Sequence, residues 1–413
     1  MKNKLKINII DLLLCFSDAL DLVSPLISSH QVRVAYIALK IAKQYKLPKE
    51  VIDRIVIASC IHDIGATTIQ ERNKLIKLDF ETDGRHEIIG WKYLKNSKFH
   101  YISDIVKYHH LKWNKGKEME GIPLESYIIH LADRVDVAIK RDKYILEQRD
   151  DIVKYISANS GSWFMPELVN TFLEVSKNES FWLYTASNNL EDILSKEAKL
   201  PKMYLDIDEL YDVTKWFSNI IDFRSRFTSV HSRGVSASAA AIATVMNLDK
   251  EEIKLIEIAG FIHDLGKLAV PNTILEKNGK LDKEEYNIIK SHTFHTYNIL
   301  SRIKSMNKIN EYGSYHHEKL DGTGYPFHIK ARQMKLGSKI LAVADMFTAI
   351  AEDRPYRLAM EKDQIVGLIA PRGDNKTFDS KVVKAFLENY EFIDEKRKDA
   401  QAKAKVEYES FWI

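Results

Sequence analysis

The chain carries one sequence pattern twice, and this repeat constrains the fold more than any other feature. Cys60–Thr68 reads CIHDIGATT, and Phe261–Val270 reads FIHDLGKLAV. At an offset of 201 residues the two halves align without a gap over 11–65 of the first copy, so that His30 matches His231. We interpret the repeat as two copies of one domain. With 413 residues, the chain is long enough to hold both.

Further along the chain the two copies differ by insertions. The offset is 206 residues between the next matching histidines, His86 and His292, and 212 residues between Asp133 and Asp345. YHH, at 108–110 and again at 315–317, lies between these matches at an offset of 207. The second copy has therefore gained five residues in each of two loops, which contain VPNTILEKNGK and DGTGYP. We expect these loops to do something that the first copy does not do.

Both copies read as helical. In EVIDRIVIASCIHDIG (50–65) and EEIKLIEIAGFIHDLG (251–266) the apolar residues recur at intervals of three and four, and each stretch ends at a glycine, a common helix stop. Asp282 is a candidate N-cap for the helix that follows it. No convincing alternating strand pattern is present. The sequence therefore predicts an all-α protein of two tandem helical bundles, with domains at 1–195 and 203–413 and a charged helix at the C-terminus.

Composition excludes several classes of protein. Apolar residues make up 45% and charged residues 29%, which favours a folded core over disorder. The net charge of +3 gives no reason to expect a DNA or RNA polymer as a partner. Asp11, Asp18 and Asp21 interrupt the apolar N-terminal stretch, so no segment is expected to span a membrane. The two cysteines, Cys15 and Cys60, have apolar neighbours and read as reduced thiols of a cytoplasmic protein.

Five histidines and two aspartates recur in the same order in each copy. In the second copy they are His231, His263, Asp264, His292, His316, His317 and Asp345; in the first copy they are His30, His62, Asp63, His86, His109, His110 and Asp133. Imidazole and carboxylate ligands suit iron, manganese, zinc or nickel, and the lack of thiolates argues against a structural zinc site. Seven ligands are too many for one ion with an open position, but they suit two ions bridged by Asp264. Such a pair can activate water and bind the oxygens of a phosphodiester.

A single His-Asp pair would be weak evidence for a metal site, because such a pair is often a plain hydrogen bond. The ordered set, present twice, favours metal binding in both copies, and more strongly in the second. His100, His130, His295 and His328 lie outside the pattern, and we interpret them as structural.

The second half, from about Tyr204 to Asn389, resembles an HD-GYP domain, a subclass of the HD superfamily. The resemblance rests on the motifs HDLGK (263–267), ILEKNGKL (274–281), HHEKLDGTGYP (316–326), ADMFTAI (344–350), DRPYR (353–357) and FDSKVVKAF (378–386). It implies a helical bundle around two or three metal ions, commonly iron and sometimes manganese. It also implies a phosphodiesterase that hydrolyses a cyclic dinucleotide, c-di-GMP or 3′,3′-cGAMP, to the linear 5′-phosphorylated dinucleotide.

The resemblance also implies roles for single residues of the second copy. The seven histidines and aspartates match the metal ligands, and Asp264 is in addition a catalytic candidate. Lys267 matches the lysine that contacts the scissile phosphate, which makes it a candidate for catalysis and for substrate binding. Tyr325 of the GYP loop, with Arg354 and Arg357 of DRPYR, completes the substrate-binding candidates.

Two positions depart from the family pattern. Members with three metals have a glutamate four residues before the first histidine, where this chain has Phe227 and, in the first copy, Leu26. We therefore expect two ions in the second copy, iron or manganese. The usual glycine four residues after His292 is Thr296, which should leave the ligand in place and change the local packing.

The first copy resembles an HD domain without the GYP elements. Ala66 stands where Lys267 stands in the second copy, HHLKWNKGK replaces HHEKLDGTGYP, and KRDKYI replaces EDRPYR. A second dimetal centre could form here without a means of holding phosphate. We expect this domain to be regulatory or dimerising, so that the protein could be a homodimer.

Other functions stay open on the sequence alone. One is an HD hydrolase of mononucleotides such as dNTPs or (p)ppGpp, although the GYP and DRPYR motifs count against it. Another is a non-catalytic signalling or scaffold module, against which the complete ligand set and Lys267 count. A diiron oxygenase is an option for the first copy only. The sequence does not choose between c-di-GMP and 3′,3′-cGAMP.

Overall fold

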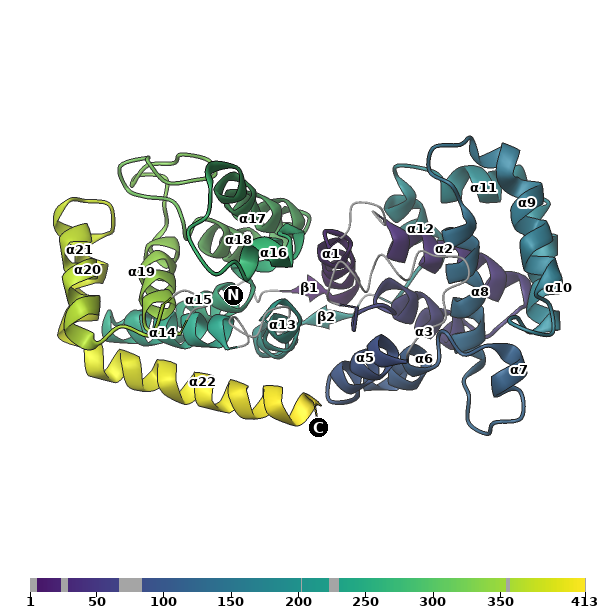
Figure 1. Ribbon diagram of the computed structural model, residues 1–413, viewed down its shortest axis with the longest axis horizontal. Helices are drawn as coiled ribbons and strands as arrows, with labels where there is room; N and C mark the ends of the chain where they lie inside the picture. The colour runs from purple at the N-terminus through teal and green to yellow at the C-terminus, as the bar shows by residue number, and fades with distance from the viewer. Residues whose placement is uncertain are drawn as a thin grey trace. The chain divides into compact units, whose positions relative to one another are not determined.

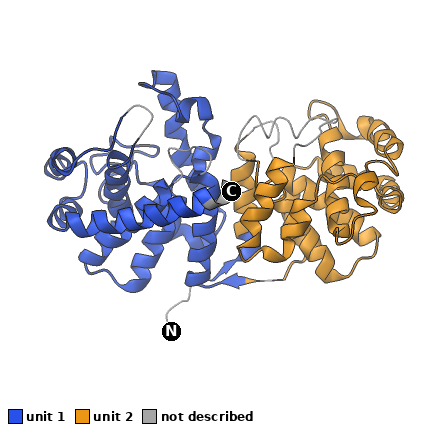
Figure 2. Ribbon diagram, turned by 60° about the horizontal axis from the view of Figure 1, so that its bottom comes forward, with its two compact units in different colours: residues 1–11, 204–413 blue, residues 12–203 orange. Residues whose placement is uncertain are grey.

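The structure, a computed structural model, describes residues 6–23, 29–66, 84–201, 203–222, 230–353 and 357–412, and most of them are helical (Figure 1). The chain forms two compact units (Figure 2). Leu12–Met203 is called here the N-terminal unit, and Tyr204–Ile413 together with Met1–Asp11 is called the C-terminal unit. The predicted fold class, an all-α protein of two tandem helical bundles, is confirmed.

The N-terminal unit is a bundle arranged around α2, which packs against α3, α8, α10 and α12. Most of α2 is buried, as expected of a helix with neighbours on several sides. Its elements are α1 (Ile9–Asp21) from Leu12 on, α2 (His30–Gln44), α3 (Lys49–Cys60), α5 (Arg85–Lys95), the 3₁₀ helix η2 (His100–Ile102), α6 (Ser103–Lys107), α7 (Trp113–Gly116), α8 (Leu124–Ala138), α9 (Ile145–Ala158), α10 (Pro166–Ser176), α11 (Glu179–Thr185) and α12 (Leu190–Ala198).

The C-terminal unit is arranged in the same way around α14, which packs against α15, α19 and α22. Its elements are β1 (Ile7–Asn8), β2 (Tyr204–Leu205), α13 (Ile207–Asp222), α14 (His231–Val245), α15 (Lys250–Ile262), η3 (Leu265–Ala269), α16 (Asn272–Leu275), α17 (Lys283–Ser301), η4 (Lys304–Met306), α18 (Asn307–Ser314), α19 (Leu336–Ile350), α20 (Lys362–Asp374), α21 (Ser380–Glu388) and α22 (Tyr390–Trp412).

Small side chains let the helices of this core approach closely. The sequence of α14, HSRGVSASAAAIATV, consists largely of alanine, serine and glycine. A Cβ atom on Gly260 of α15 would lie 2.7 Å from the Cα atom of Ser236 on α14, which is closer than any side chain allows. The close contact brings the C-terminal end of α15, where the His-Asp pair begins, against α14, whose first residue is His231.

The predicted helix start at Asp282 is confirmed. The Asp282 side chain accepts from the backbone N–H groups of Glu284 and Glu285, and Glu285 completes a capping box. None of the described helices combines the length and the apolar character that crossing a bilayer requires.

The units differ from the predicted domains at the N-terminus. β1 pairs with β2 in antiparallel register, Ile7 with Leu205 and Asn8 with Tyr204, so the start of the chain groups with the C-terminal unit. Between the repeats, the polar stretch at 185–202 contains α12, which packs on α2. The functional boundaries 1–195 and 203–413 therefore stay a prediction.

Candidate metal centres

Asp264 of the C-terminal unit stands between two pairs of histidines. It lies between His263, the C-cap of α15, and the start of η3. Its Oδ2 atom lies 3.1 Å from His263 Nε2 and 3.8 Å from His231 Nε2. Its Oδ1 atom lies 3.3 Å from His292 Nε2 and 4.0 Å from His316 Nε2. Each oxygen of one carboxylate thus faces its own pair of imidazoles, which is the arrangement that a bridging ligand needs.

Backbone carbonyl groups orient three of these imidazoles. The Nδ1 atoms of His263, His292 and His316 donate to the carbonyl oxygens three residues earlier, at 2.8, 2.6 and 2.6 Å. A carbonyl oxygen can only accept, so Nδ1 carries the proton and Nε2 of a neutral ring has its lone pair available. Each ring therefore turns an unprotonated nitrogen toward Asp264, as in metal sites whose outer partners fix the tautomer.

A carboxylate orients the first histidine, and sequence reasoning missed it. His231 Nδ1 lies 3.1 Å from Glu352 Oε2, just beyond the end of α19. The other ring nitrogen, Nε2, lies 3.2 Å from Asp345 Oδ1. Glu352 is held in turn by Gln401 of α22, whose amide donates to Oε1. Arg397, one turn earlier on α22, donates to Gln401 Oε1 at 2.6 Å.

His317 and Asp345 complete the predicted set at its more exposed side. His317 Nδ1 lies 4.0 Å from Asp345 Oδ2, and the His317 side chain is 31% exposed, whereas those of the other four histidines are at most 1% exposed. His292, His316 and His317 form one group of ligand atoms within 4.8 Å of one another. His231, His263 and Asp264 form a second such group. Two ions could be held side by side, with His317 nearest to solvent.

The protonation states fit divalent cations. Burial lowers the pKa of His292 to about 3, and burial together with His317 holds the pKa of His316 well below its usual range. Burial would raise the pKa of Asp264, but His263 and Lys267 outweigh it and keep the pKa well below normal. Neutral imidazoles and ionised carboxylates are the forms that bind metals. In the described part of the chain, His263 Nε2 and Asp264 Oδ1 are buried and make no hydrogen bond, which a cation between them would remedy.

Lys267 lies at the same centre. Its position on η3, three residues after Asp264, brings its Nζ atom to 2.5 Å from Asp264 Oδ2. The side chain remains 22% exposed, so its ammonium group is at the edge of the buried cluster. That it contacts the scissile phosphate stays a prediction.

The GYP loop packs directly on His317. The Tyr325 N–H donates to the His317 carbonyl at 3.2 Å, and the two rings lie 4.9 Å apart between centroids. A Cβ atom on Gly324 would lie 2.3 Å from the backbone nitrogen of Lys319, so only glycine fits there. Glu318 holds the far end of the loop by accepting from the Phe327 N–H at 2.7 Å. The tyrosine predicted to bind substrate is thus fixed beside the most exposed ligand.

Of the two arginines in DRPYR that were predicted to bind substrate, the structure describes only Arg357. Arg357 donates to the backbone carbonyls of Ala349, Ile350 and Leu358, at 2.8 to 2.9 Å. It therefore holds the end of α19 and the segment after it, and a contact with substrate stays a prediction. Arg354 lies outside the described residues, and so do Phe227 and Leu26, on which the expected metal count rests.

Thr296 stands where the family pattern has glycine, and its hydroxyl group makes two hydrogen bonds. Its hydroxyl donates to the His263 carbonyl at 3.1 Å and accepts from the Gly266 N–H at 2.9 Å. The matching residue of the N-terminal unit is Gly90, over which an added Cβ atom would be crowded by Ile64 and Val106. The threonine thus ties α17 to the turn that carries the His-Asp pair, in line with the expected change in packing.

The N-terminal unit repeats the central arrangement. Asp63 Oδ1 lies 3.6 Å from His86 Nε2 and 3.5 Å from His109 Nε2. Its Oδ2 atom lies 3.7 Å from His30 Nε2 and 3.6 Å from His62 Nε2. In the described residues, the Nε2 atoms of His86 and His109 are buried and make no hydrogen bond. These donors also fit a pair of cations, although metal binding here stays a prediction.

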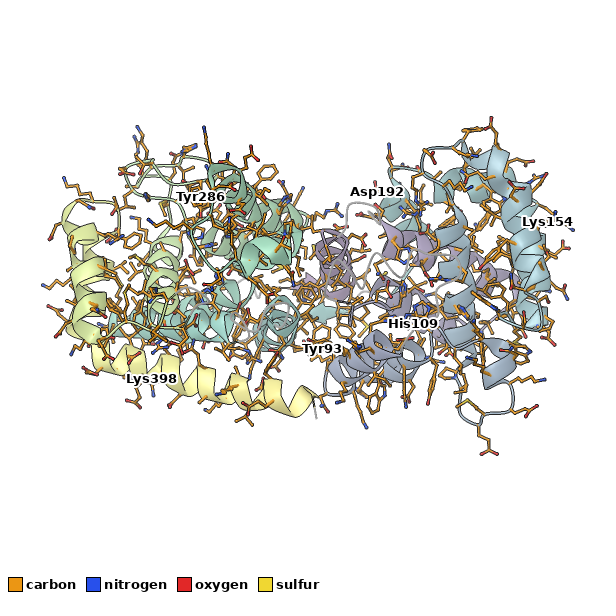
Figure 3. All side chains as sticks on the ribbon, viewed as in Figure 1. Tyr93, His109, Lys154, Asp192, Tyr286 and Lys398 are labelled. Atoms are coloured by element: carbon orange, nitrogen blue, oxygen red, sulfur yellow. The ribbon has the colours of Figure 1, made fainter. Side chains whose placement is uncertain are left out.

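Asp133 and His110 complete the N-terminal set. Asp133 Oδ1 lies 3.4 Å from His30 Nε2, and its Oδ2 atom lies 3.6 Å from His110 Nδ1. All seven residues predicted from the repeat are therefore brought together in each unit. His109 lies in the interior of its unit, in contrast to the exposed Lys154 (Figure 3).

The surroundings of the N-terminal cluster differ from those of the C-terminal one. His30 Nδ1 donates to Asp136 Oδ2 at 2.7 Å, and Asp136 is also bound by Arg33 and Arg141 at 2.6 and 2.8 Å. Arg134 binds Asp133 Oδ2 at 2.7 Å. At the positions of Arg134 and Asp136, the C-terminal unit has Met346 and Thr348.

Comparison with known proteins agrees with this architecture. Residues 27–138 and 215–382 each match a family model described as HD domain. A 3′3′-cGAMP-specific phosphodiesterase of Vibrio cholerae is 28% identical over 399 residues, which are 93% of this chain and 92% of that protein. A cyclic di-GMP phosphodiesterase response regulator of Xanthomonas campestris is 35% identical over 200 residues, and this chain spans about half, 52%, of its length.

A solved structure has the same fold. It is a cyclic GMP-AMP specific phosphodiesterase of V. cholerae, it covers 94% of this chain with a TM-score of 0.67, and it is 22% identical in sequence. Because both halves match the HD-domain family models, the chain is a tandem HD-domain protein of the HD superfamily. The resemblance to the HD-GYP phosphodiesterases, inferred from the motifs of the second copy, is confirmed.

Proposed function

We propose that the C-terminal unit is a metal-dependent phosphodiesterase that hydrolyses a cyclic dinucleotide to the linear 5′-phosphorylated dinucleotide. The observation that carries this proposal is the position of Asp264, with one carboxylate oxygen facing each pair of histidines and Lys267 beside it. The relative matched over most of its length is named for 3′3′-cGAMP, which makes this dinucleotide the first substrate to test and c-di-GMP the second.

The residues of the site divide the work as follows. The seven histidines and aspartates would hold two divalent cations, iron or manganese, which supply Lewis-acid activation of water and of the phosphodiester when bound. Lys267 places a positive charge next to the bridging position, where the negative charge of a phosphate would develop during attack. Tyr325 offers a flat surface next to His317, on which a base can stack. Arg357 holds the end of α19 through the carbonyls of Ala349 and Ile350.

The N-terminal unit lacks a counterpart of Lys267, and this difference supports the proposal. Ala66, fully buried, occupies the position of Lys267, and no charged group can act from it. We therefore assign hydrolysis to the second domain, 203–413, and a regulatory or dimerising role to the first, 1–195.

Product analysis tests the proposal. The purified full-length protein is loaded anaerobically with Fe²⁺ or Mn²⁺ and incubated with 3′,3′-cGAMP, c-di-GMP, dGTP, ppGpp and bis(p-nitrophenyl) phosphate. We expect linear dinucleotide from at least one cyclic substrate, loss of activity with a chelator, and no product with an Asp264→Ala protein purified in parallel. Faster turnover of dGTP or ppGpp would identify a mononucleotide hydrolase. Failure to cleave any substrate at full metal loading would indicate a non-catalytic signalling or scaffold module.

A further inference from the structure

Glu318 follows the adjacent histidines His316 and His317, and its carboxylate is buried although it belongs to a loop. The residue is 1% exposed, and its Oε1 atom accepts from the Phe327 N–H at 2.7 Å. Its Oε2 atom is buried and makes no hydrogen bond within the described part of the chain. A buried carboxylate that is only half satisfied costs stability, so the benefit of this side chain lies in something other than folding.

The backbone after the GYP motif is shaped around this carboxylate. His328 has a φ angle of +54°, in the left-handed region, and such a residue turns consecutive N–H groups to one side of the chain. Burial raises the pKa of Glu318, and the backbone N–H groups of 327–329 oppose the rise. Consecutive N–H groups of the loop therefore face one side chain, which explains the unusual conformation of His328.

The GYP loop is thus fastened on both sides of Tyr325. Before it, a Cβ atom on Gly324 would lie 2.4 Å from the Cα atom of Glu318, so the two backbone segments are in contact. The Tyr325 N–H donates to the His317 carbonyl at 3.2 Å. After it, Phe327 donates to the Glu318 carboxylate. These contacts hold the Tyr325 ring at 4.9 Å from the His317 ring, measured between centroids.

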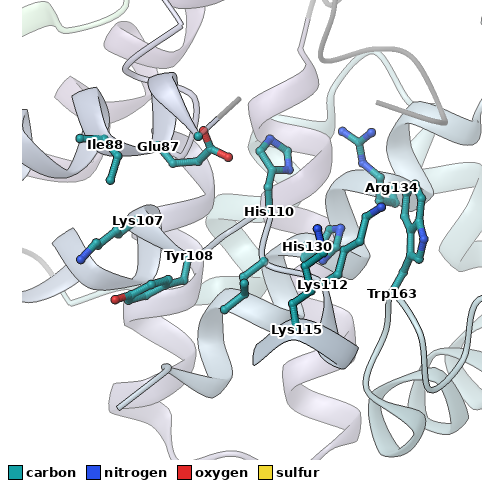
Figure 4. A pocket seen from close by; sticks show the side chains of 12 residues that line it. Glu87, Ile88, Lys107, Tyr108, His110, Lys112, Lys115, His130, Arg134 and Trp163 are labelled. Atoms are coloured by element: carbon teal, nitrogen blue, oxygen red, sulfur yellow. The ribbon is translucent and has the colours of Figure 1, made fainter. Parts of the chain in front are cut away.

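At the matching position the N-terminal unit has a leucine, Leu111, which accepts no hydrogen bond through its side chain. Leu111 lines a pocket beside His110, the counterpart of His317 (Figure 4). The chain then continues into α7 and contains no GYP motif. The anchoring carboxylate is therefore particular to the unit to which hydrolysis is assigned.

From these contacts we infer that Glu318 is a positioning residue, which fixes the GYP loop so that Tyr325 is in place before a substrate binds. The inference rests on the proposed hydrolysis of a cyclic dinucleotide, in which Tyr325 contacts a base. A loop that is already ordered loses little entropy on binding, so the anchor should lower KM. Because Glu318 acts through the loop and not on the phosphodiester, kcat should depend on it little.

Kinetics of two variants of the full-length, Mn²⁺-loaded protein test the inference. Glu318→Leu introduces the residue type of the N-terminal unit, whereas Glu318→Gln keeps an oxygen that can accept a hydrogen bond. Glu388→Leu, at the exposed end of α21, is the matched control. With 3′,3′-cGAMP or c-di-GMP, KM should rise at least about tenfold in Glu318→Leu, because a hydrogen bond to a charged group is lost. The kcat should stay within about threefold of the wild-type value, with unchanged metal content.

The glutamine variant and the control distinguish the hydrogen bond from a general effect. KM of Glu318→Gln should be closer to that of the wild type than to that of Glu318→Leu, and Glu388→Leu should match the wild type. An unchanged KM in Glu318→Leu would overturn the inference, and so would an equal rise in the leucine and glutamine variants. Loss of metal from Glu318→Leu would also overturn it, since the residue would then support the whole centre.

Amide hydrogen exchange of peptides spanning 318–331 supplies a readout that needs no turnover. These peptides should exchange at least about tenfold faster in Glu318→Leu than in the wild type and in Glu388→Leu, because the loop has lost its anchor. Unchanged exchange would show that the carboxylate does not hold the loop. A wild-type protein that cleaves neither cyclic dinucleotide would contradict the proposed function instead, and the role of Glu318 would then stand or fall with the exchange measurement.

Discussion

The N-terminal and C-terminal units place the same seven residue types around one aspartate, yet their cations differ in position. In the C-terminal unit Lys267 Nζ lies 2.5 Å from Asp264 Oδ2, the aspartate between the two pairs of histidines. In the N-terminal unit the matching residue is the buried Ala66, and the buried Arg134 binds Asp133 instead. The duplicated ligand set has thus kept its geometry while the charge that could face a phosphate has moved. On the proposed division of labour, the shared histidines and aspartates alone do not determine which unit acts on a substrate.

The variant with the largest expected effect tests whether the C-terminal unit alone hydrolyses the substrate. Asp264→Ala should reduce phosphodiesterase turnover by at least about a thousandfold, because the bridge between the two metal positions is lost. Asp63→Ala, the matching change in the N-terminal unit, should leave substantial activity. Both variants are assayed as full-length proteins for product formation at saturating substrate. Losses of about half in each variant would mean two independent active sites and would end the proposed division.

Lys267→Ala should have the next largest effect. A preorganised contact to the charge that develops on a phosphate is worth a factor of roughly 10²–10³ in kcat, and Ala66 shows that the fold tolerates alanine at this position. Lys381→Ala, an exposed lysine of the same unit, serves as the control. The metal content of both proteins should equal that of the wild type. A Lys267→Ala protein with normal kcat would show that this lysine only neutralises Asp264.

Glu352 and Asp136 contact Nδ1 of the first histidine in their units and are called here the outer carboxylates. Each should raise the metal affinity of its unit. Glu352→Gln and Asp136→Asn each remove the charge that holds Nδ1 of the first histidine, so the affinity of that unit for Mn²⁺ should fall by about 10–100-fold. Competition with a chromophoric chelator measures the two losses separately. Unchanged affinity in either variant would show that this carboxylate has no part in positioning the histidine.

Acidification should weaken the C-terminal unit before the N-terminal one. His292 and His316 have lowered pKa values, so their stabilising effect is present above about 6.5, the value in an unfolded chain, and is lost as the pH falls toward 3. In the N-terminal unit burial also lowers the pKa values of His62 and His110. The pKa values of His30 and His109 are raised, because Asp136 and Asp63 outweigh burial, so protonation of these two rings partly offsets the loss.

Amide hydrogen exchange of the chelator-treated chain at pH 7 and pH 5 measures this difference. Each histidine whose pKa is lowered can change the folding equilibrium constant by at most about tenfold per pH unit. Protection factors of peptides from α15 and α17 should fall more than those of peptides from α3 and α5. An equal fall in both sets would contradict the expected difference.

The sequence was sufficient to find the two clusters of histidines and aspartates, because each of their residues recurs at a matching position in the other copy. It was not sufficient for the outer carboxylates. Asp136 aligns with Thr348, and its counterpart in function, Glu352, comes four residues later. Since the same role is filled from non-equivalent positions, comparison of the repeats could not reveal it. The β1–β2 pair was missed for another reason: two residues in each strand leave no alternating pattern to recognise.

The hydrogen bond from Gln401 to Glu352 has a practical consequence for work on this protein. α22 contains none of the motifs by which the C-terminal unit is recognised, and its charged sequence invites removal when a shorter chain is wanted. Yet a chain ending before Gln401 would release Glu352, and with it the ring of His231. Trimming the chain back past Gln401 should therefore act like a mutation in the candidate metal centre, and a preparation that loses metal after such a change should be repaired by restoring the helix before any ligand is suspected.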